Sequence, residues 1–198
     1  SAIVFGDAAP AGEAGEITPE TSPSPASAYG RSKLEAEHGL RALENERFRV
    51  TILRPMMVYG PGCKGNYNRL RGLVSRMNFF PDFSNLRGAI YVESLVELIL
   101  RIIQGGQGGI YHPQDEFVAA TADFVREIAR FRGKTMHFTR VFNPFLRLLG
   151  GVSIVRRAFG SFSYRPDMTE FPQQYRITPF PESVRRTEEA LLAGGKNG

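Results

Sequence analysis

Cysteine and long apolar runs are both nearly missing from this sequence. Cys63 is the single cysteine among 198 residues, which excludes an internal disulfide and fits a reducing cytosol. No apolar run approaches the ~18 residues that a membrane-spanning helix needs. The chain also does not open with the basic region and apolar stretch of a signal peptide. We therefore expect a cytoplasmic protein without a membrane partner.

Blocks of like charge are absent as well, although the formal net charge is +5. The arginines are spread along the chain, with doublets such as Arg156-Arg157 and Arg185-Arg186. Because no run of five or six like charges occurs, we expect solvated faces and a few anion-binding arginines rather than a nucleic-acid surface.

Three further motifs are missing. His38, His112 and His137 lack metal-ligand spacing, so no metal site is expected. No Gly-x-Ser-x-Gly elbow of a serine hydrolase occurs. We also find no glycine-rich turn between a first strand and its helix, which a dinucleotide site needs. The glycine-dense stretch 105–109 leads into a strand and is interpreted as a connection.

Strand and helix patterns alternate through most of the chain, with a long Ala/Gly/Pro/Ser-rich loop at residues 8–25. This order favours an α/β fold with a parallel sheet. Ser94 and Thr121 are expected to cap helices. The expected strands are 2–5, 50–53, 89–92, 110–112 and 161–165, and the expected helices are 27–45, 66–77, 94–103, 122–131 and 182–192.

Tyr29 and Lys33 stand four residues apart in a predicted helix, so they share one face, a turn apart. A lysine ammonium beside a phenol favours the phenolate; at about 4 Å and an effective dielectric near 20 the attraction is roughly 4 kcal/mol. The tyrosine is then suited to acid/base work. The pair alone is only suggestive, because a tyrosine and a lysine can share a helix by chance.

Other segments of the sequence, before and after this pair, carry further motifs. Residues 1–7 (Ser-Ala-Ile-Val-Phe-Gly-Asp) precede the helix sequence 28–37 (Ala-Tyr-Gly-Arg-Ser-Lys-Leu-Glu-Ala-Glu). Leu-Arg-Pro at 53–55, Val-Tyr-Gly-Pro-Gly at 58–62 and Arg-Gly-Ala-Ile-Tyr-Val at 87–92 follow in order. Together these segments resemble the extended short-chain dehydrogenase/reductase family, and among its members the NAD-dependent sugar-nucleotide epimerases and dehydratases, most of all the 4-epimerases. The resemblance is good over residues 1–113 and loose beyond.

The resemblance implies a catalytic set of Ser1, Tyr29 and Lys33. In it Tyr29 is the acid/base, and Lys33 also binds the nicotinamide ribose of NAD, with NADP possible. Pro55 and Met56 would contact the cofactor. Met57 departs from the family pattern, where a polar residue is common, which leaves the sugar open.

For the nucleotide-sugar substrate the resemblance implies Asn66, Arg87 and Arg157. Asn66 is equally compatible with a simple helix cap. Arg87 suits a diphosphate because a guanidinium is a planar fork, the alternative being a solvated arginine. Arg157 is balanced between a second diphosphate contact and surface charge.

The fold expected from the resemblance is the C-terminal part of a Rossmann-type doubly wound parallel sheet plus a smaller substrate-binding lobe, without the N-terminal dinucleotide-binding half. We divide the chain into residues 1–113, the second half of the Rossmann-type domain with the catalytic motif and parts of the lobe, and residues 114–198, mainly the lobe. The piece alone is expected to be inactive, and the Tyr-Lys helix to form a homodimer. Val4-Phe5-Gly6 stands where a dehydratase of the family carries acidic groups, which favours an epimerase or dehydrogenase over a dehydratase. We expect a 4-epimerase, with a sugar-nucleotide dehydrogenase, reductase or dehydratase of the family as the alternative. A non-catalytic NAD(P)-sensing protein is the alternative from another class.

Overall fold

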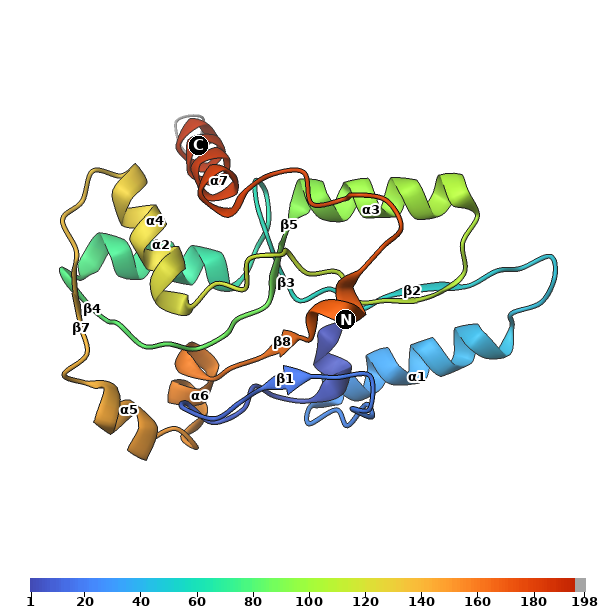
Figure 1. Ribbon diagram of the computed structural model, residues 1–198, viewed down its shortest axis with the longest axis horizontal. Helices are drawn as coiled ribbons and strands as arrows, with labels where there is room; N and C mark the ends of the chain where they lie inside the picture. The colour runs from blue at the N-terminus through green and yellow to red at the C-terminus, as the bar shows by residue number, and fades with distance from the viewer. Residues whose placement is uncertain (195–198) are drawn as a thin grey trace.

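Short strands paired in parallel form the framework of the chain (Figure 1). The structure is a computed structural model that describes residues 1–194. Its strands are β1 (Glu16–Ile17), β2 (Thr51–Leu53), β3 (Met57–Tyr59), β4 (Phe79–Pro81), β5 (Ala89–Tyr91), β6 (Gly109–Tyr111), β7 (His137–Thr139) and β8 (Ser163–Tyr164). Its helices are η1 (Ala2–Phe5), α1 (Ala28–Ala42), α2 (Asn66–Arg76), α3 (Val92–Gly105), α4 (Thr121–Phe131), α5 (Asn143–Leu148), α6 (Ser153–Phe159), η2 (Pro166–Thr169) and α7 (Phe180–Gly194).

Each strand pairs with one that is distant in sequence. β2 runs beside β6, β3 beside β5, β4 beside β7 and β1 beside β8, all in parallel. Parallel partners need a crossover between them, which the helices supply. In Figure 1, α3 and α1 lie on opposite sides of the layer that holds β2. The expected α/β fold with a parallel sheet is thereby confirmed.

The main core surrounds Tyr59, which is fully buried. The Tyr59 ring stacks on Tyr67 with centroids 5.8 Å apart and meets the edge of Phe124 at 5.3 Å. Val184 of α7 packs in the same cluster. Residues on both sides of the expected boundary at position 113 thus share this one core.

Helix α1 begins close to the expected start at residue 27, where Ser27 is its N-cap. The Ser27 hydroxyl accepts a hydrogen bond from the Gly30 amide at 3.1 Å, which satisfies one free N–H of the first turn. Its packed face is narrow: Gly30 and Glu37 are its buried residues. Leu40 and Leu43 stay 45% and 61% exposed, so α1 turns apolar side chains to solvent.

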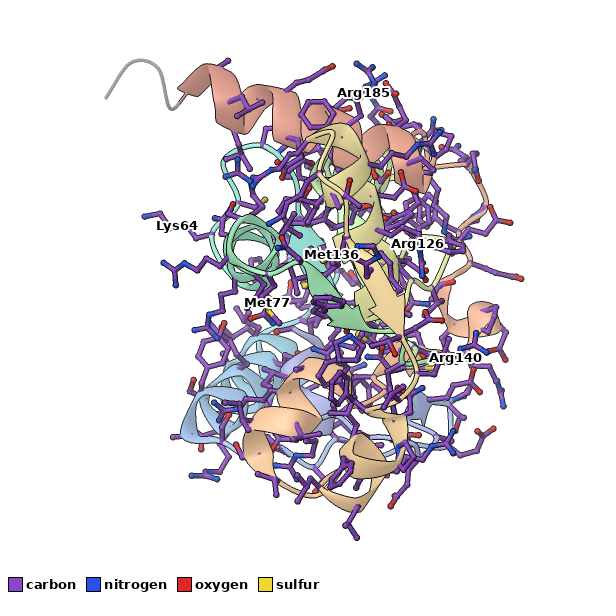
Figure 2. The ribbon with its side chains drawn as sticks, turned by 90° about the vertical axis from the view of Figure 1, so that its left-hand side faces the viewer. Lys64, Met77, Arg126, Met136, Arg140 and Arg185 are labelled. Atoms are coloured by element: carbon purple, nitrogen blue, oxygen red, sulfur yellow. The ribbon has the colours of Figure 1, made fainter. Side chains whose placement is uncertain are left out.

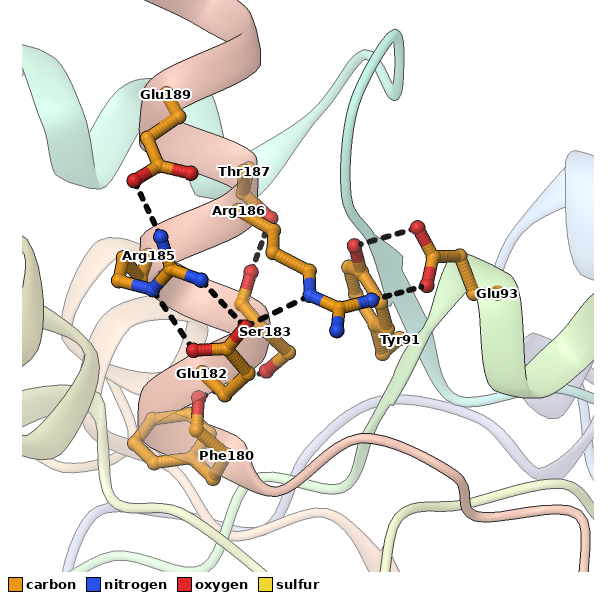
Figure 3. A network of polar contacts seen from close by, with 9 residues as sticks. All are labelled: Tyr91, Glu93, Phe180, Glu182, Ser183, Arg185, Arg186, Thr187 and Glu189. Carbon is orange, nitrogen blue, oxygen red and sulfur yellow. Dashed lines mark hydrogen bonds and ion pairs between the residues drawn. The ribbon is translucent and has the colours of Figure 1, made fainter.

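Helix α7 is fixed at its start by a network of charged side chains (Figure 3). Arg185 and Arg186 both pair with Glu182, at 2.6 and 2.8 Å. Arg186 also reaches Glu93 of α3 at 3.1 Å, and Glu93 accepts the hydroxyl of Tyr91. The network joins the start of α7 to the junction of β5 and α3.

Several expectations at element ends are wrong. Residues 2–5 form the short helix η1 rather than a strand, because the amides of Val4 and Gly6 bond back to the carbonyls of Ser1 and Ile3. Ser94 lies inside the first turn of α3, and Tyr91 takes the cap position. Thr121 also lies inside its helix, and its hydroxyl donates to the carbonyl of Ala158 instead. Tertiary contacts decide these ends.

The loop expected at residues 8–25 contains β1, which pairs with β8 at the other end of the chain. Within residues 1–194, no helix has both the length and the apolar content to cross a bilayer.

Candidate active site

Tyr29 and Lys33 stand on the first two turns of α1. The Lys33 ammonium lies over the Tyr29 ring, 5.3 Å from its centroid. Tyr29 is 60% exposed and Lys33 is exposed too. The structure therefore presents a phenol and an ammonium together at the surface, in reach of a bound molecule.

A close contact between α1 and η1 positions the start of this helix. A β-carbon at Gly30 would lie 2.9 Å from the carbonyl oxygen of Ile3 and 2.9 Å from the β-carbon of Pro25. Since real β-carbons do not come so close, a glycine beside Tyr29 is what lets η1 touch the helix. Tyr29 is thus held near the segment that begins with Ser1.

Ser1 and Ala2 run along the end of β2. The Ser1 nitrogen donates to the Leu53 carbonyl at 3.1 Å, and the Ala2 amide donates to the Pro55 carbonyl at 3.2 Å. Ser1, Pro55 and the start of α1 are therefore brought to one place.

A buried ion pair between Arg54 and Glu37 anchors α1, and it was not expected from the sequence. Arg54 donates to Glu37 through Nη2 at 2.7 Å and Nε at 3.1 Å, and both residues are 7% exposed. The Arg54 guanidinium also lies 5.1 Å from the Phe5 ring centroid. Glu37 and Arg54 stand 17 positions apart in the sequence, and no local spacing marks them as partners.

Met56 lies under this region rather than at its surface. It is 5% exposed and packs with Ala2, Ile17 and Tyr164. The Tyr164 hydroxyl donates to the Arg54 carbonyl at 2.7 Å, and its ring meets that of His112 edge-on at 4.9 Å. Burial, and then the charge of Arg54, lower the pKa of His112 to about 4.

Arg87 lies between two chain segments. Its amide donates to the Ala119 carbonyl at 3.0 Å, and its guanidinium Nη1 donates to the Gly160 carbonyl at 3.3 Å. Burial lowers its pKa. No carboxylate among residues 1–194 pairs with Arg87, so this partly desolvated guanidinium is well suited to receive an anion.

Asn66 and Arg157 are both exposed. Asn66 is the first residue of α2, and Gly65 holds the cap position, so the expectation of a simple cap is wrong. Arg157 lies in the last turn of α6, the helix that Gly160 ends. In Figure 1, α2 and α1 lie on opposite sides of the molecule. No contact among the described residues joins Asn66 or Arg157 to Tyr29.

One glycine-rich loop does link a strand to a helix, but it differs from the dinucleotide-binding turn that was not found in the sequence. Residues 60–65 (Gly-Pro-Gly-Cys-Lys-Gly) link β3 to α2, and all three glycines have positive φ. Yet β3 pairs with β5, and β4, which follows α2, pairs with β7. This loop therefore opens no βαβ unit of the dinucleotide-binding type. Within residues 1–194, no three His, Cys, Asp or Glu side chains converge to hold a metal ion.

Known proteins share this sequence and this fold. UDP-glucose 4-epimerase of Vibrio cholerae is 34% identical over 186 residues, which are 87% of this chain and 56% of that protein. The chain thus spans little more than half of that relative's length.

Solved structures agree on the fold. dTDP-glucose 4,6-dehydratase from Bacillus anthracis in complex with NAD superposes with a TM-score of 0.70 at 17% identity, over 99% of this chain and 61% of that one. UDP-glucose 4-epimerase from Thermotoga maritima with UDP-glucose gives 0.66 at 17% identity, over 98% and 61%. Both likenesses show the Rossmann-type architecture and cover only part of it.

The sequence model of one family, described as the NAD dependent epimerase/dehydratase family, matches residues 1–112. That match covers more than half of the chain and includes the Tyr29–Lys33 helix, η1 and the Leu-Arg-Pro segment. The chain belongs to the NAD dependent epimerase/dehydratase family.

Proposed function

We propose that the protein containing this chain is an NAD-dependent 4-epimerase acting on a nucleotide-diphosphate sugar. The observation that carries the proposal is the exposed Tyr29–Lys33 pair, held by Gly30 against the segment that starts with Ser1. The likeness to a UDP-glucose 4-epimerase supports the substrate class. A dehydrogenase, reductase or dehydratase of the same family is the alternative, distinguished below by its products.

The residues present fit one end of NAD. Tyr29 and Lys33 offer an exposed hydroxyl and ammonium, the groups that a ribose hydroxyl would meet, and Pro55 and buried Met56 support the same place from below. NADP would fit this end equally well. When bound, NAD supplies the acceptor and donor of a hydride. Among residues 1–194 the pyrophosphate has no βαβ turn to hold it, so these side chains would hold only the nicotinamide ribose.

The protein's own part in the reaction is to move one proton. The Tyr29 phenolate accepts the proton of the sugar hydroxyl that is oxidised and returns it when the sugar is reduced again. The Lys33 ammonium, 5.3 Å from the Tyr29 ring centroid, places a positive charge beside the phenol that gives and takes the proton. The Ser1 hydroxyl holds the sugar oxygen by a hydrogen bond during the transfer.

Substrate binding would fall to residues away from α1. Arg87 would hold the diphosphate with its unpaired guanidinium, and Asn66 and Arg157 would add polar contacts from α2 and α6. The exposed Leu40 and Leu43 on α1 support a homodimer through the Tyr-Lys helix. A cytosolic location suits a soluble nucleotide-sugar substrate.

The decisive experiment measures interconversion of UDP-glucose and UDP-galactose by the whole protein and its Tyr29→Phe variant. We expect turnover to fall by about 10²–10⁴-fold or more while NAD binding is kept, because the phenol transfers the proton but does not hold the fold. Tyr111→Phe on β6 is the matched control. Activity within tenfold of the native protein would remove Tyr29 from catalysis. A 4-keto-6-deoxy product or net NADH formation would favour the alternatives.

A second variant tests the substrate side. Arg87→Ala should raise the Michaelis constant for the nucleotide sugar roughly ten- to a hundredfold, because a charge-assisted contact contributes about 1.5–3 kcal/mol. Arg87→Lys should restore only part of it, since an ammonium lacks the planar fork. Unchanged constants in a substrate titration at fixed salt would contradict the assignment.

A further inference from the structure

A cavity of about 720 Å³ opens away from the residues discussed so far. It lies between the loop at 115–117, one side of α4 and the segment 176–181 that leads into α7. Figure 2 shows Arg126, one of its lining residues, projecting from α4 below α7. None of the candidate catalytic or substrate residues lines it. The volume falls in the range of small-molecule sites, roughly 300–1,000 Å³.

Two aromatic rings form the apolar part of the cavity. The centroids of Phe117 and Phe180 are 5.1 Å apart, with the ring planes tilted by 38°. Phe180 is fixed by the buried Phe124, whose ring meets it edge-on at 4.9 Å. Phe117 and the neighbouring Ile177 remain 53% and 52% exposed. Phe117, Phe180 and Ile177 thus line the cavity with large apolar side chains.

Carboxylates outnumber arginines in the lining of the cavity. Arg126 pairs with Asp123 at 2.6 Å and with Asp82 at 3.2 Å. Arg176 donates through Nε to the Gln114 carbonyl at 2.9 Å and through Nη2 to the Thr169 carbonyl at 2.9 Å. The four lining carboxylates are Asp115, Glu116, Asp123 and Glu127.

Asp115 is the most unusual of these carboxylates. It is only 9% exposed, and its Oδ2 accepts the Tyr91 amide at 3.0 Å and the Tyr59 hydroxyl at 3.2 Å. Its Oδ1 is buried, and no group among residues 1–194 donates to it. The charge of this carboxylate is thus incompletely compensated by hydrogen bonds, which favours a positive group nearby.

We propose that this cavity binds a small organic monocation, a primary amine with an aromatic or alicyclic body. The ammonium lies at the Asp115 end, where the charge of the carboxylate attracts it. The body lies against Phe117 and Phe180, where ring faces attract a cation and bury apolar surface. An anion is disfavoured because the four lining carboxylates outnumber the two arginines.

The pH dependence of binding follows from the same carboxyl. Burial raises the pKa of Asp115 to about 6, against the opposing influence of the Tyr91 amide, the Tyr59 hydroxyl and the Arg176 guanidinium that face it. A cation binds the ionised carboxylate, so binding should strengthen from pH 5 to pH 7.5.

The probe is 2-phenylethylammonium, compared with neutral 2-phenylethanol and anionic 3-phenylpropionate, titrated into the full chain and followed by calorimetry and amide NMR shifts. We expect the amine to bind at least tenfold more tightly than the alcohol and the carboxylate to bind weakest. Equal affinity for the amine and the alcohol would overturn the proposal.

Variants locate the site. Phe117→Ala should weaken amine binding at least threefold, whereas Phe142→Ala, an aromatic of similar exposure (51%) outside the cavity, should leave it unchanged. Asp115→Asn should remove the pH dependence. If that variant does not fold, the pH profile of the native protein and the comparison of Phe117→Ala with Phe142→Ala still test the proposal. Binding that ignores both pH and Phe117 contradicts the assignment.

Discussion

Helices α1 and α7 each have 15 residues, yet they are held in different ways. α7 buries Ser183, Val184, Thr187 and Glu188, so it joins the main core. α1 buries only Gly30 and Glu37. Both helices carry one buried glutamate paired with arginine. The difference teaches that a helix carrying the proposed catalytic groups can be held by one ion pair and one glycine contact, with little apolar packing.

The two buried glutamates give the largest expected effects. Glu188 is fully buried and pairs with Arg71 and Arg132, each at 2.8 Å. Glu188→Gln and Glu37→Gln should each lower the free energy of unfolding by about 3–5 kcal/mol, because the partner guanidiniums lose their counter-charge. Glu37→Gln should in addition reduce turnover, since it loosens the helix that carries Tyr29. Urea denaturation and steady-state assays measure both.

Exposed neighbours serve as controls for that pair. Glu189→Gln on α7 and Glu35→Gln on α1 should change stability by no more than about 0.5 kcal/mol. If Glu37→Gln is as mild as Glu35→Gln, then α1 is held by something other than its ion pair, and the comparison fails.

His112, which titrates beside η1, should have an effect of intermediate size on the pH dependence of stability. Burial lowers the pKa of His112 to about 4, and Arg54 adds to the shift. An unfolded histidine binds a proton near pH 6.5, so the contribution of neutral His112 is fully present above pH 6.5 and is lost as the pH falls towards 4. Between pH 7.5 and pH 5, the free energy of unfolding of the His112→Phe variant should therefore fall by about 1–2 kcal/mol less than that of the native protein. Urea denaturation at each pH measures both proteins. An equal fall in the free energy of unfolding of the two would show that His112 is not the pH-sensitive group.

The smallest effect is expected on the outer side of α1. Leu43 is 61% exposed, so Leu43→Ser should change the stability of the monomer by no more than about 0.5 kcal/mol. In the proposed homodimer the same change should weaken self-association several-fold. Sedimentation equilibrium beside denaturant melts separates the two. A large loss of monomer stability would mean that this side of α1 is packed after all.

The elements that sequence reasoning found were those with a strong local pattern. The helix opened by Ser27 carries its own cap, and the strand at Ala89 is a short buried apolar run. The misses have non-local causes. Ser94 and Thr121 are good cap residues in isolation, but the chain enters their helices one to three residues earlier.

The residues of the candidate site fall into the same two groups, those with a local sequence pattern and those that the fold brings together. Residue spacing and the resemblance to a family single out Tyr29, Lys33 and Arg87 as candidates, whereas the polar partners that the fold brings together were not visible in the sequence. Glu37 meets Arg54 across 17 positions, and Tyr59 meets Asp115 across 56. No local periodicity marks such pairs.

The parallel pairing has a consequence for how the chain reaches its structure. β1 cannot pair until β8 is available, and Asp7 meets Arg156 across 149 positions. Contacts this distant must overcome the entropy of closing a long loop before they contribute stability, which slows folding. During synthesis the early strand must wait for most of the chain to leave the ribosome. We expect β1 and the loop around it to acquire protection from hydrogen exchange last, after the core around Tyr59 has formed.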